Sequence, residues 1–223
     1  QSGTEHWTLV DTSAGQLTAQ AVHNDGDYDA WRTTDNFTQV GNLNYQYVPT
    51  LLEDEVLVEN GWIMRGRIRV EDVANTIDTA VAMQVGLAST SQLFQLGLSV
   101  DANDNTIFAL HNGSNFTSVS GSVEGVGYHL YEIVYDPDTQ TIDLFVDGDE
   151  LINNFAGRNY ANLRQVLFGA NSGGGTGTGY FNMVEFVVLP EPGGIILLFS
   201  LLLPILSLRP RRRRNYQADL SGD

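Results

Sequence analysis

Apolar and polar residues alternate along several segments, and the clearest lies between positions 130 and 147. Leu130, Glu132 and Val134 alternate with Tyr131, Ile133 and Tyr135, and a second alternating run follows from Thr141 to Asp147. Successive side chains of a β-strand point to opposite faces, so this period of two predicts two strands. Asp136-Pro137-Asp138-Thr139 between them has turn chemistry, and Asp147-Gly148-Asp149 predicts a second hairpin leading into a strand at Leu151-Ile152.

The same reading predicts strands along the rest of the chain. They cover Trp62–Val70, Ala80–Ala88, Leu93–Val100, Thr106–Leu110, Val166–Gly169 and Tyr180–Leu189. Ten to fourteen short strands with turns every 8–12 residues indicate an all-β, two-sheet antiparallel sandwich. We expect this domain to span residues 1–189, and no exact repeat indicates a propeller or a solenoid.

Charge narrows the choice of partners. Residues 1–189 contain six arginines, no lysine and 24 acidic residues, a net charge of six minus 24, or −18. A body this acidic repels phosphates, so no nucleic acid partner is expected. The absence of cysteine excludes a thiol nucleophile, a cysteine zinc site and a disulfide framework. The chain opens at Gln1, which suggests that an export signal has been removed.

The most specific pattern has three consecutive parts after Leu189. Pro190, Glu191 and Pro192 form a stiff extended hinge, residues 193–208 carry no charge, and arginines then cluster. Sixteen helical residues span about 24 Å, which is short of a hydrocarbon core of about 30 Å. The pattern therefore predicts a marginal transmembrane helix. The basic cluster would hold its end in the cytoplasm as a membrane stop, and it consists of Arg209, Arg211, Arg212, Arg213 and Arg214.

This C-terminal pattern resembles the PEP-CTERM sorting signal of Gram-negative bacteria, with residues 215–223 as a tail after the signal. The resemblance implies that an exosortase, a membrane-embedded protease, recognises Pro190, Glu191 and Pro192 and cleaves nearby. Residues 193–208 would then be only a transient membrane segment. It also implies final placement at the cell surface or in the extracellular matrix. A plain tail anchor with a proline hinge is the alternative.

The body resembles concanavalin A-like jelly-roll domains of the laminin-G type. The runs that carry this resemblance are 129–148, 166–175 and A-W-R-T-T-D-N at 30–36. It implies two curved antiparallel sheets with loops along a rim. Some jelly rolls are lectins, but a fold alone does not determine function.

Two features could bind a ligand. Asp25, Asp27 and Asp29 offer oxygen ligands at alternate positions, which suits Ca²⁺, with an acidic turn as the alternative. Trp31, Tyr160 and Tyr180 are candidates for stacking on sugar rings, although aromatic residues of a sandwich more often lie in its core.

No motif indicates catalysis, and we expect no enzyme. The glucanase pattern E-x-D-x-x-E and the nucleophile pattern G-x-S-x-G are absent, and the four histidines lack metal-ligand spacing. Glu53-Asp54-Glu55 is interpreted as a solvated loop. The sequence thus predicts an exported surface or matrix protein that binds carbohydrate or mediates adhesion. The alternatives are an acidic coat protein without a specific ligand and a glycan hydrolase.

Overall fold

The computed structural model describes most of the first 190 residues. The described ranges are 7–13, 15–26, 28–36, 41–71, 80–113, 119–172 and 176–190. The chain divides into two units, Gln1–Leu189 and Pro190–Asp223. Within the described ranges no helix is long and apolar enough to cross a membrane. The predicted membrane segment 193–208 lies outside these ranges, as do Glu191, Pro192 and the arginine cluster.

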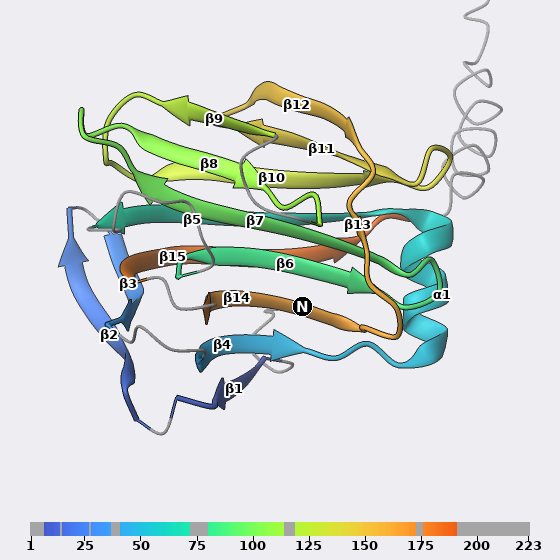
Figure 1. Cartoon of the computed structure of the whole chain (residues 1–223), viewed down its shortest axis with the longest axis horizontal. Coiled ribbons are helices and arrows are strands. Elements are labelled where there is room, and N and C mark those ends of the chain that lie inside the picture. Colours follow the sequence, from blue (N-terminus) through green and yellow to red (C-terminus); the bar gives the residue numbers. More distant parts are fainter. Residues whose placement is uncertain are drawn as a thin grey trace, which may run out of the picture. The chain divides into compact units, whose positions relative to one another are not determined.

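The first unit is a sandwich of two antiparallel sheets (Figure 1). Sheet A runs in the order β1 (Thr8–Asp11), β4 (Gly41–Tyr47), β14 (Gln165–Ser172), β6 (Ala82–Leu87), β7 (Gln92–Val100), β8 (Thr106–Leu110) and β9 (Ser120–Val123), with β13 (Arg158–Asn159) paired to β7. Sheet B runs in the order β12 (Asp149–Phe155), β11 (Thr141–Val146), β10 (His129–Asp136), β5 (Trp62–Glu71), β15 (Gly177–Val188), β3 (Tyr28–Asp35) and β2 (Leu17–Asp25). The all-β sandwich is therefore confirmed.

Alternation along β5 shows how the sequence builds both the core and a solvent face. Trp62, Met64, Gly66, Ile68 and Val70 are buried, whereas the residues between them are half-buried. Trp62 stacks on Tyr135 of β10 with ring centroids 5.4 Å apart. A Cβ at Gly66 would lie 2.6 Å from the sulfur of Met83 in the opposite sheet, so a larger residue here would require the Met83 side chain to move. The inward side chains of β5 thus pack in the core between the two sheets.

One helix, α1 (Leu51–Asn60), corrects the interpretation of Glu53-Asp54-Glu55 as a loop. Thr50 caps the helix: its hydroxyl accepts from the Glu53 amide at 3.2 Å, and its own amide donates to the Glu53 carboxylate at 2.7 Å. Asp54 is buried and accepts hydrogen bonds from the amides of Ala88 and Ser89 at 3.2 and 2.8 Å. Its carboxylate holds α1 against the turn after β6.

Candidate functional site

Four arginines lie on the outward face of sheet B. Arg65, Arg67 and Arg69 occupy alternate positions of β5 and therefore point to the same side, and Arg32 of β3 lies on that side, opposite Tyr180 in the register. They make up four of the six arginines in residues 1–189, and this part of the chain contains no lysine. The central strand region of sheet B thus concentrates the scarce positive charge of an acidic domain.

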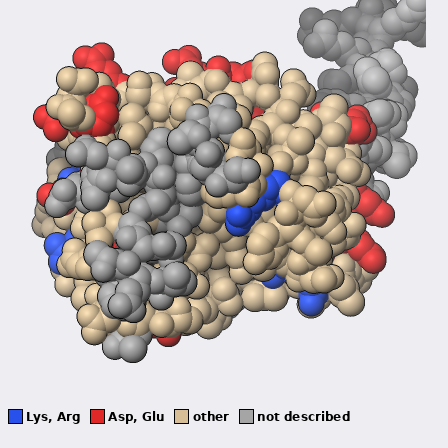
Figure 2. Space-filling model, in the orientation of Figure 1, with Lys and Arg blue, Asp and Glu red and all other residues tan. Residues whose placement is uncertain are grey.

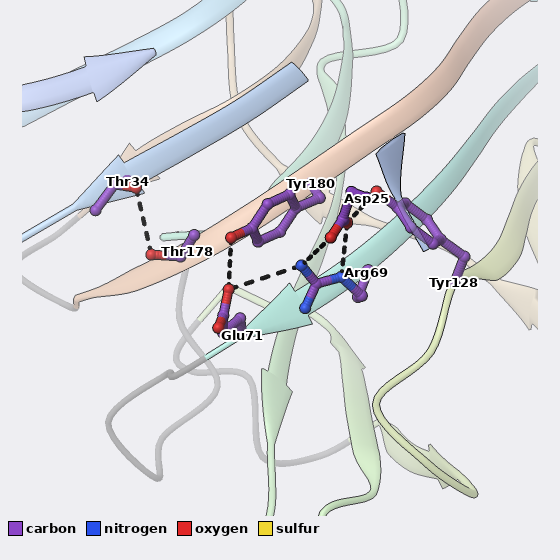
Figure 3. Close-up of polar contacts among 7 residues, drawn as sticks. All are labelled: Asp25, Thr34, Arg69, Glu71, Tyr128, Thr178 and Tyr180. Carbon is purple, nitrogen blue, oxygen red and sulfur yellow. Dashed lines mark hydrogen bonds and ion pairs between the residues drawn. The ribbon is translucent and has the colours of Figure 1, made fainter. Parts of the chain in front are cut away.

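Arg69 is fully engaged (Figure 3). Its Nε and Nη2 donate to the two carboxylate oxygens of Asp25, both at 2.9 Å, and the hydroxyl of Tyr128 donates to Asp25 Oδ2 at 2.6 Å. The guanidinium lies 3.9 Å from the centre of the Tyr180 ring, and the Tyr180 hydroxyl donates to Glu71 at 2.6 Å. These contacts fasten the β2–β3 hairpin, which carries Asp25, to the centre of the sheet.

The protonation of this cluster follows from its contacts. Burial would raise the pKa of Asp25, but the hydrogen bonds from Tyr128 and Arg69 and the charge of Arg69 outweigh it, so this pKa lies below its usual range. Burial raises the pKa of Tyr128, and the Asp25 carboxylate beside it raises this pKa further. Asp25 is therefore ionised and Tyr128 neutral at neutral pH.

Arg65 is engaged at the other end of the row. Its Nε lies 2.6 Å from Glu132 of β10 and its Nη1 lies 3.4 Å from Glu185 of β15. Both acids flank Arg65 in the register of the sheet. The hydrogen bond that Arg65 donates to Glu132, with the charges of both acids, raises the pKa of Arg65 despite some desolvation.

Arg67, between these two, has no carboxylate within 4.0 Å among the residues that the structure describes. Its guanidinium lies 5.3 Å from the centre of the Tyr28 ring and 3.4 Å from Asn182 Oδ1. Tyr28 is 38% exposed and packs edge-on against Tyr128, with ring centroids 5.0 Å apart. We call Tyr28, Arg67, Tyr128 and Asn182 the Arg67 site.

The local fold explains how these side chains meet. The register between β15 and β5 shifts between Phe181 and Met183, so Asn182 is an extra residue in a β-bulge. Bulges redirect side chains, and Asn182 both accepts from Arg67 and donates to the Asp29 carbonyl at 2.8 Å. Tyr28 comes from the hairpin that Asp25 fastens to Arg69. An aromatic ring, an amide and a free guanidinium thus share one partly exposed surface.

The structure brings together only some of the predicted site residues. Asp25 and Tyr180 lie in the Arg69 cluster, and Asp29 contacts Asn182, whereas Asp27 lies outside the described residues. Trp31 is half-buried and packs edge-on against Tyr45 at 5.6 Å. Tyr160 is 47% exposed and lies beside sheet A, where the Arg158 guanidinium is 5.2 Å from its ring centre. Pro190 is exposed at the end of the described chain.

Both carboxylate oxygens of Asp25 already accept hydrogen bonds, so a cation in this turn would compete with Arg69. Asp29 is mostly exposed and lies 3.4 Å from His23. No group of three or more His, Asp or Glu side chains able to hold a metal occurs within the described ranges. The calcium site at Asp25, Asp27 and Asp29 remains a prediction.

Sequence reasoning missed the Arg67 site. The available signal was the run M-R-G-R-I-R at 64–69, which places arginine at alternate strand positions in a chain that otherwise has few. Tyr28, Tyr128 and Asn182 carry no comparable signal, because only the hairpin, the β10 start and the β15 bulge bring them to β5.

Comparison with known proteins agrees with a lectin-like fold. Residues 53–188 match the family of the Vibrio cholerae sialidase lectin insertion. This match includes Arg67, Tyr128 and Asn182 but not the β2–β3 hairpin. None of the curated proteins is similar enough in sequence to match the chain.

Three solved structures share the fold at 12% sequence identity. The carbohydrate esterase vb_24B_21 of the Shiga toxin-encoding bacteriophage phi24B superimposes with a TM-score of 0.62, over 83% of this chain and 91% of the esterase. The binding domain of botulinum neurotoxin DC, solved with rat synaptotagmin II, gives 0.52 over 87% of this chain and 47% of that one. Botulinum neurotoxin type C, whose cell entry depends on two ganglioside molecules, gives 0.51 over 88% and 47%. The chain thus spans about half the length of either neurotoxin structure.

Proposed function

Because the chain belongs to the family of the Vibrio cholerae sialidase lectin insertion, we propose that its first 189 residues form a carbohydrate-binding domain that recognises an acidic, carboxylate-bearing sugar. The observation that carries this proposal is the guanidinium of Arg67. It is held against Tyr28 at the centre of sheet B, and no carboxylate within the described ranges lies within 4.0 Å of it. Two similar proteins support a glycan ligand. The matching family is a lectin insertion of a sialidase, and the neurotoxin of similar fold enters cells through interaction with ganglioside molecules.

The chemistry of the Arg67 site suits such a sugar. A guanidinium can bind a carboxylate through two parallel hydrogen bonds. Neutral sugars have no carboxylate and cannot form this pair. Tyr28 offers an exposed ring face on which a sugar ring can stack, and the Asn182 amide can exchange hydrogen bonds with hydroxyls. The acidic remainder of the domain would repel a polyanion, so binding must be local to this face.

Binding is measured by titrating the full chain with a polyuronic acid and with the same polymer after its carboxyl groups are reduced. We expect binding to the acid form only. Arg67→Gln should weaken it about 10- to 100-fold, since a charge-assisted hydrogen bond contributes about 1.5–3 kcal/mol. Arg158→Gln, which removes the same charge beside sheet A, is the matched control and should change the affinity less than about twofold. Equal losses in both variants would mean non-specific electrostatics and would refute the site.

We propose that this domain binds without catalysis. Two carboxylates beside the Arg67 site are engaged, Asp25 with Arg69 and Tyr128, and Asp147 with the His129 ring at 2.7 Å. Neither is free to act as a general acid or nucleophile on a bound sugar. Prolonged incubation with the polyuronic acid should release no new reducing ends, and release that disappears in Asp147→Asn would establish a hydrolase instead.

We also propose that the protein is exported and sorted by an exosortase. The support is the order of Pro190-Glu191-Pro192, the uncharged segment 193–208 and the arginine cluster. Replacing Pro190 and Glu191 together by alanine should leave uncleaved chain in the membrane fraction of a host that carries an exosortase. Normal levels of the cleaved form would show that the motif is not read, while sugar binding by the domain would be unaffected.

A further inference from the structure

Among the described residues the strand orders of the two sheets end in four edge strands, and three of these carry features that prevent pairing with another strand. β1 and β9 are only four residues long. β12 begins with Asp149 and Glu150, and its register against β11 is interrupted twice. Short length, charge and irregular register are the usual protections of an exposed sheet edge.

β2 lacks these protections over most of its length. This edge strand has nine residues, and Leu17 to Val22 contain no charged residue, proline or glycine. Their pairing with β3 is regular from Leu17 to Val22, and the register shifts only between Val22 and Asp25. The side chains of Thr18, Gln20 and Ala21 are exposed. Within the described part of the chain no strand pairs with the second side of β2.

We propose that β2 is an interaction surface that pairs antiparallel with β2 of a second copy of this chain. The charge pattern favours a second copy. The domain has a net charge of −18 and would repel itself over most of its surface, yet this edge is neutral. In an antiparallel pair, directly opposed residues point to the same face. A two-fold axis at Gln20 therefore opposes Thr18 to Val22 and Ala19 to Ala21, all of them uncharged.

This pairing has a consequence for sugar binding. The two-fold axis lies perpendicular to the joined sheets, so the outward faces of both sheets B lie on the same side. Two Arg67 sites would then face one polysaccharide. Linking two sites in this way raises the apparent affinity for a repeating ligand without any new contact to the sugar. The pairing itself does not depend on the proposed ligand.

The chain contains no cysteine, so single cysteines report the pairing directly. The full chain is purified in mild detergent, oxidised and separated without reductant. Gln20→Cys should form a covalent dimer, because Cα atoms at the axis lie about 5 Å apart, within disulfide range. Thr18→Cys alone lies two residues from the axis, about 13 Å from its own copy, and should not crosslink. A mixture of Thr18→Cys and Val22→Cys should crosslink. The matched control on another edge, Asn153→Cys, should stay monomeric.

A charge variant provides the second measurement. Gln20→Glu opposes two carboxylates across the axis, and like charges directly opposite each other destabilise a strand pair. Sedimentation of the full chain should show a dimer for the wild type and at least a tenfold weaker dimer for Gln20→Glu, whereas the two Tm values should agree at a concentration where both chains are monomeric. Gln20→Cys crosslinking no better than Asn153→Cys, or a dimer equally strong in Gln20→Glu, would overturn the proposal.

Discussion

The outward faces of the two sheets are built from different side chains on the same alternating backbone. On sheet B the outward positions of β5 are Arg65, Arg67 and Arg69, which are half-buried. On sheet A the outward positions of β6 and β7 include Gln84 and Gln95, which are only 2% and 4% exposed. Figure 2, in which the β6–β7 sheet faces the viewer, shows acidic side chains mainly around the rim and basic side chains nearer the middle.

The difference shows which face can meet a charged ligand. Outward residues of sheet A are close-packed: a Cβ on Gly86 would lie 2.9 Å from Leu163, and the Asn171 amide donates to Gln84 at 3.0 Å. The side chain of Gln84 thus has its partner within the sheet itself. On sheet B the guanidinium of Arg67 has no carboxylate within 4.0 Å among the described residues and contacts only Asn182 and the ring of Tyr28 at short range. Sheet A thus presents a tightly packed outward face, and sheet B presents a less buried face on which arginines are concentrated.

The largest loss of stability is expected from a substitution that disrupts packing on the outward face of sheet A. Gly169 of β14 has φ +120°, and a Cβ there would lie 2.8 Å from the Leu43 carbonyl. Gly169→Ala should lower the free energy of unfolding by about 2–4 kcal/mol, from backbone strain and overpacking. Gly127→Ala, where no heavy atom lies within 4 Å, is the control and should cost less than about 0.5 kcal/mol. Urea denaturation measures both, and equal stabilities would refute close packing of this face.

A smaller loss of stability is expected when the Asp25 carboxylate on the outward face of sheet B is neutralised. Asp25→Asn weakens the contacts with Arg69 and Tyr128, whose side chains lie largely out of water, and should cost about 1–2 kcal/mol. Asp29→Asn changes a carboxylate that is 72% exposed and should cost less than about 0.5 kcal/mol. Thermal denaturation of the two variants compares them. If Asp29→Asn costs as much as Asp25→Asn, the Asp25–Arg69 contact does not fasten the hairpin.

The pH dependence of stability should sharpen this comparison. Because the folded-state pKa of Asp25 is lowered, its contribution to stability is complete above the unfolded-state value of about 3.9 and is lost as the pH falls through the folded-state value. The stability gap between wild type and Asp25→Asn should therefore be constant from pH 7 to about pH 5 and narrow below about pH 4. A gap that widens on acidification would contradict the ionised state of Asp25.

The smallest effect is expected from calcium. A cation in the 25–29 turn would have to displace Arg69 from Asp25, so millimolar Ca²⁺ should change the Tm by less than about 1 °C. An excess of chelator should be equally without effect. A clear rise in Tm that Asp25→Asn abolishes would instead establish the predicted calcium site.

Local patterns predicted much of the fold. The alternation at 130–136 and 141–147, with its two turns, predicted β10, β11 and the start of β12, because each signal is contained in a few neighbouring residues. Helix α1 was missed although Thr50 and Glu53 form a capping box, since the acidic run was interpreted without its cap. The Arg67 site could not be predicted as a whole, because its four residues come from four separate parts of the chain. The contact between Tyr180 and Arg69 could not be predicted either, because it depends on the register between β15 and β5.

The central claim is that sheet B, and not sheet A, holds the sugar. Hydrogen exchange of the full chain with and without polyuronic acid tests it most directly. We expect the sugar to slow amide exchange in β5 and in the bulged part of β15 around Asn182, and to leave exchange in β6 and β7 unchanged. Slowed exchange confined to β6, β7 or the segment around Tyr160 would mean that the sugar binds on sheet A and not on sheet B.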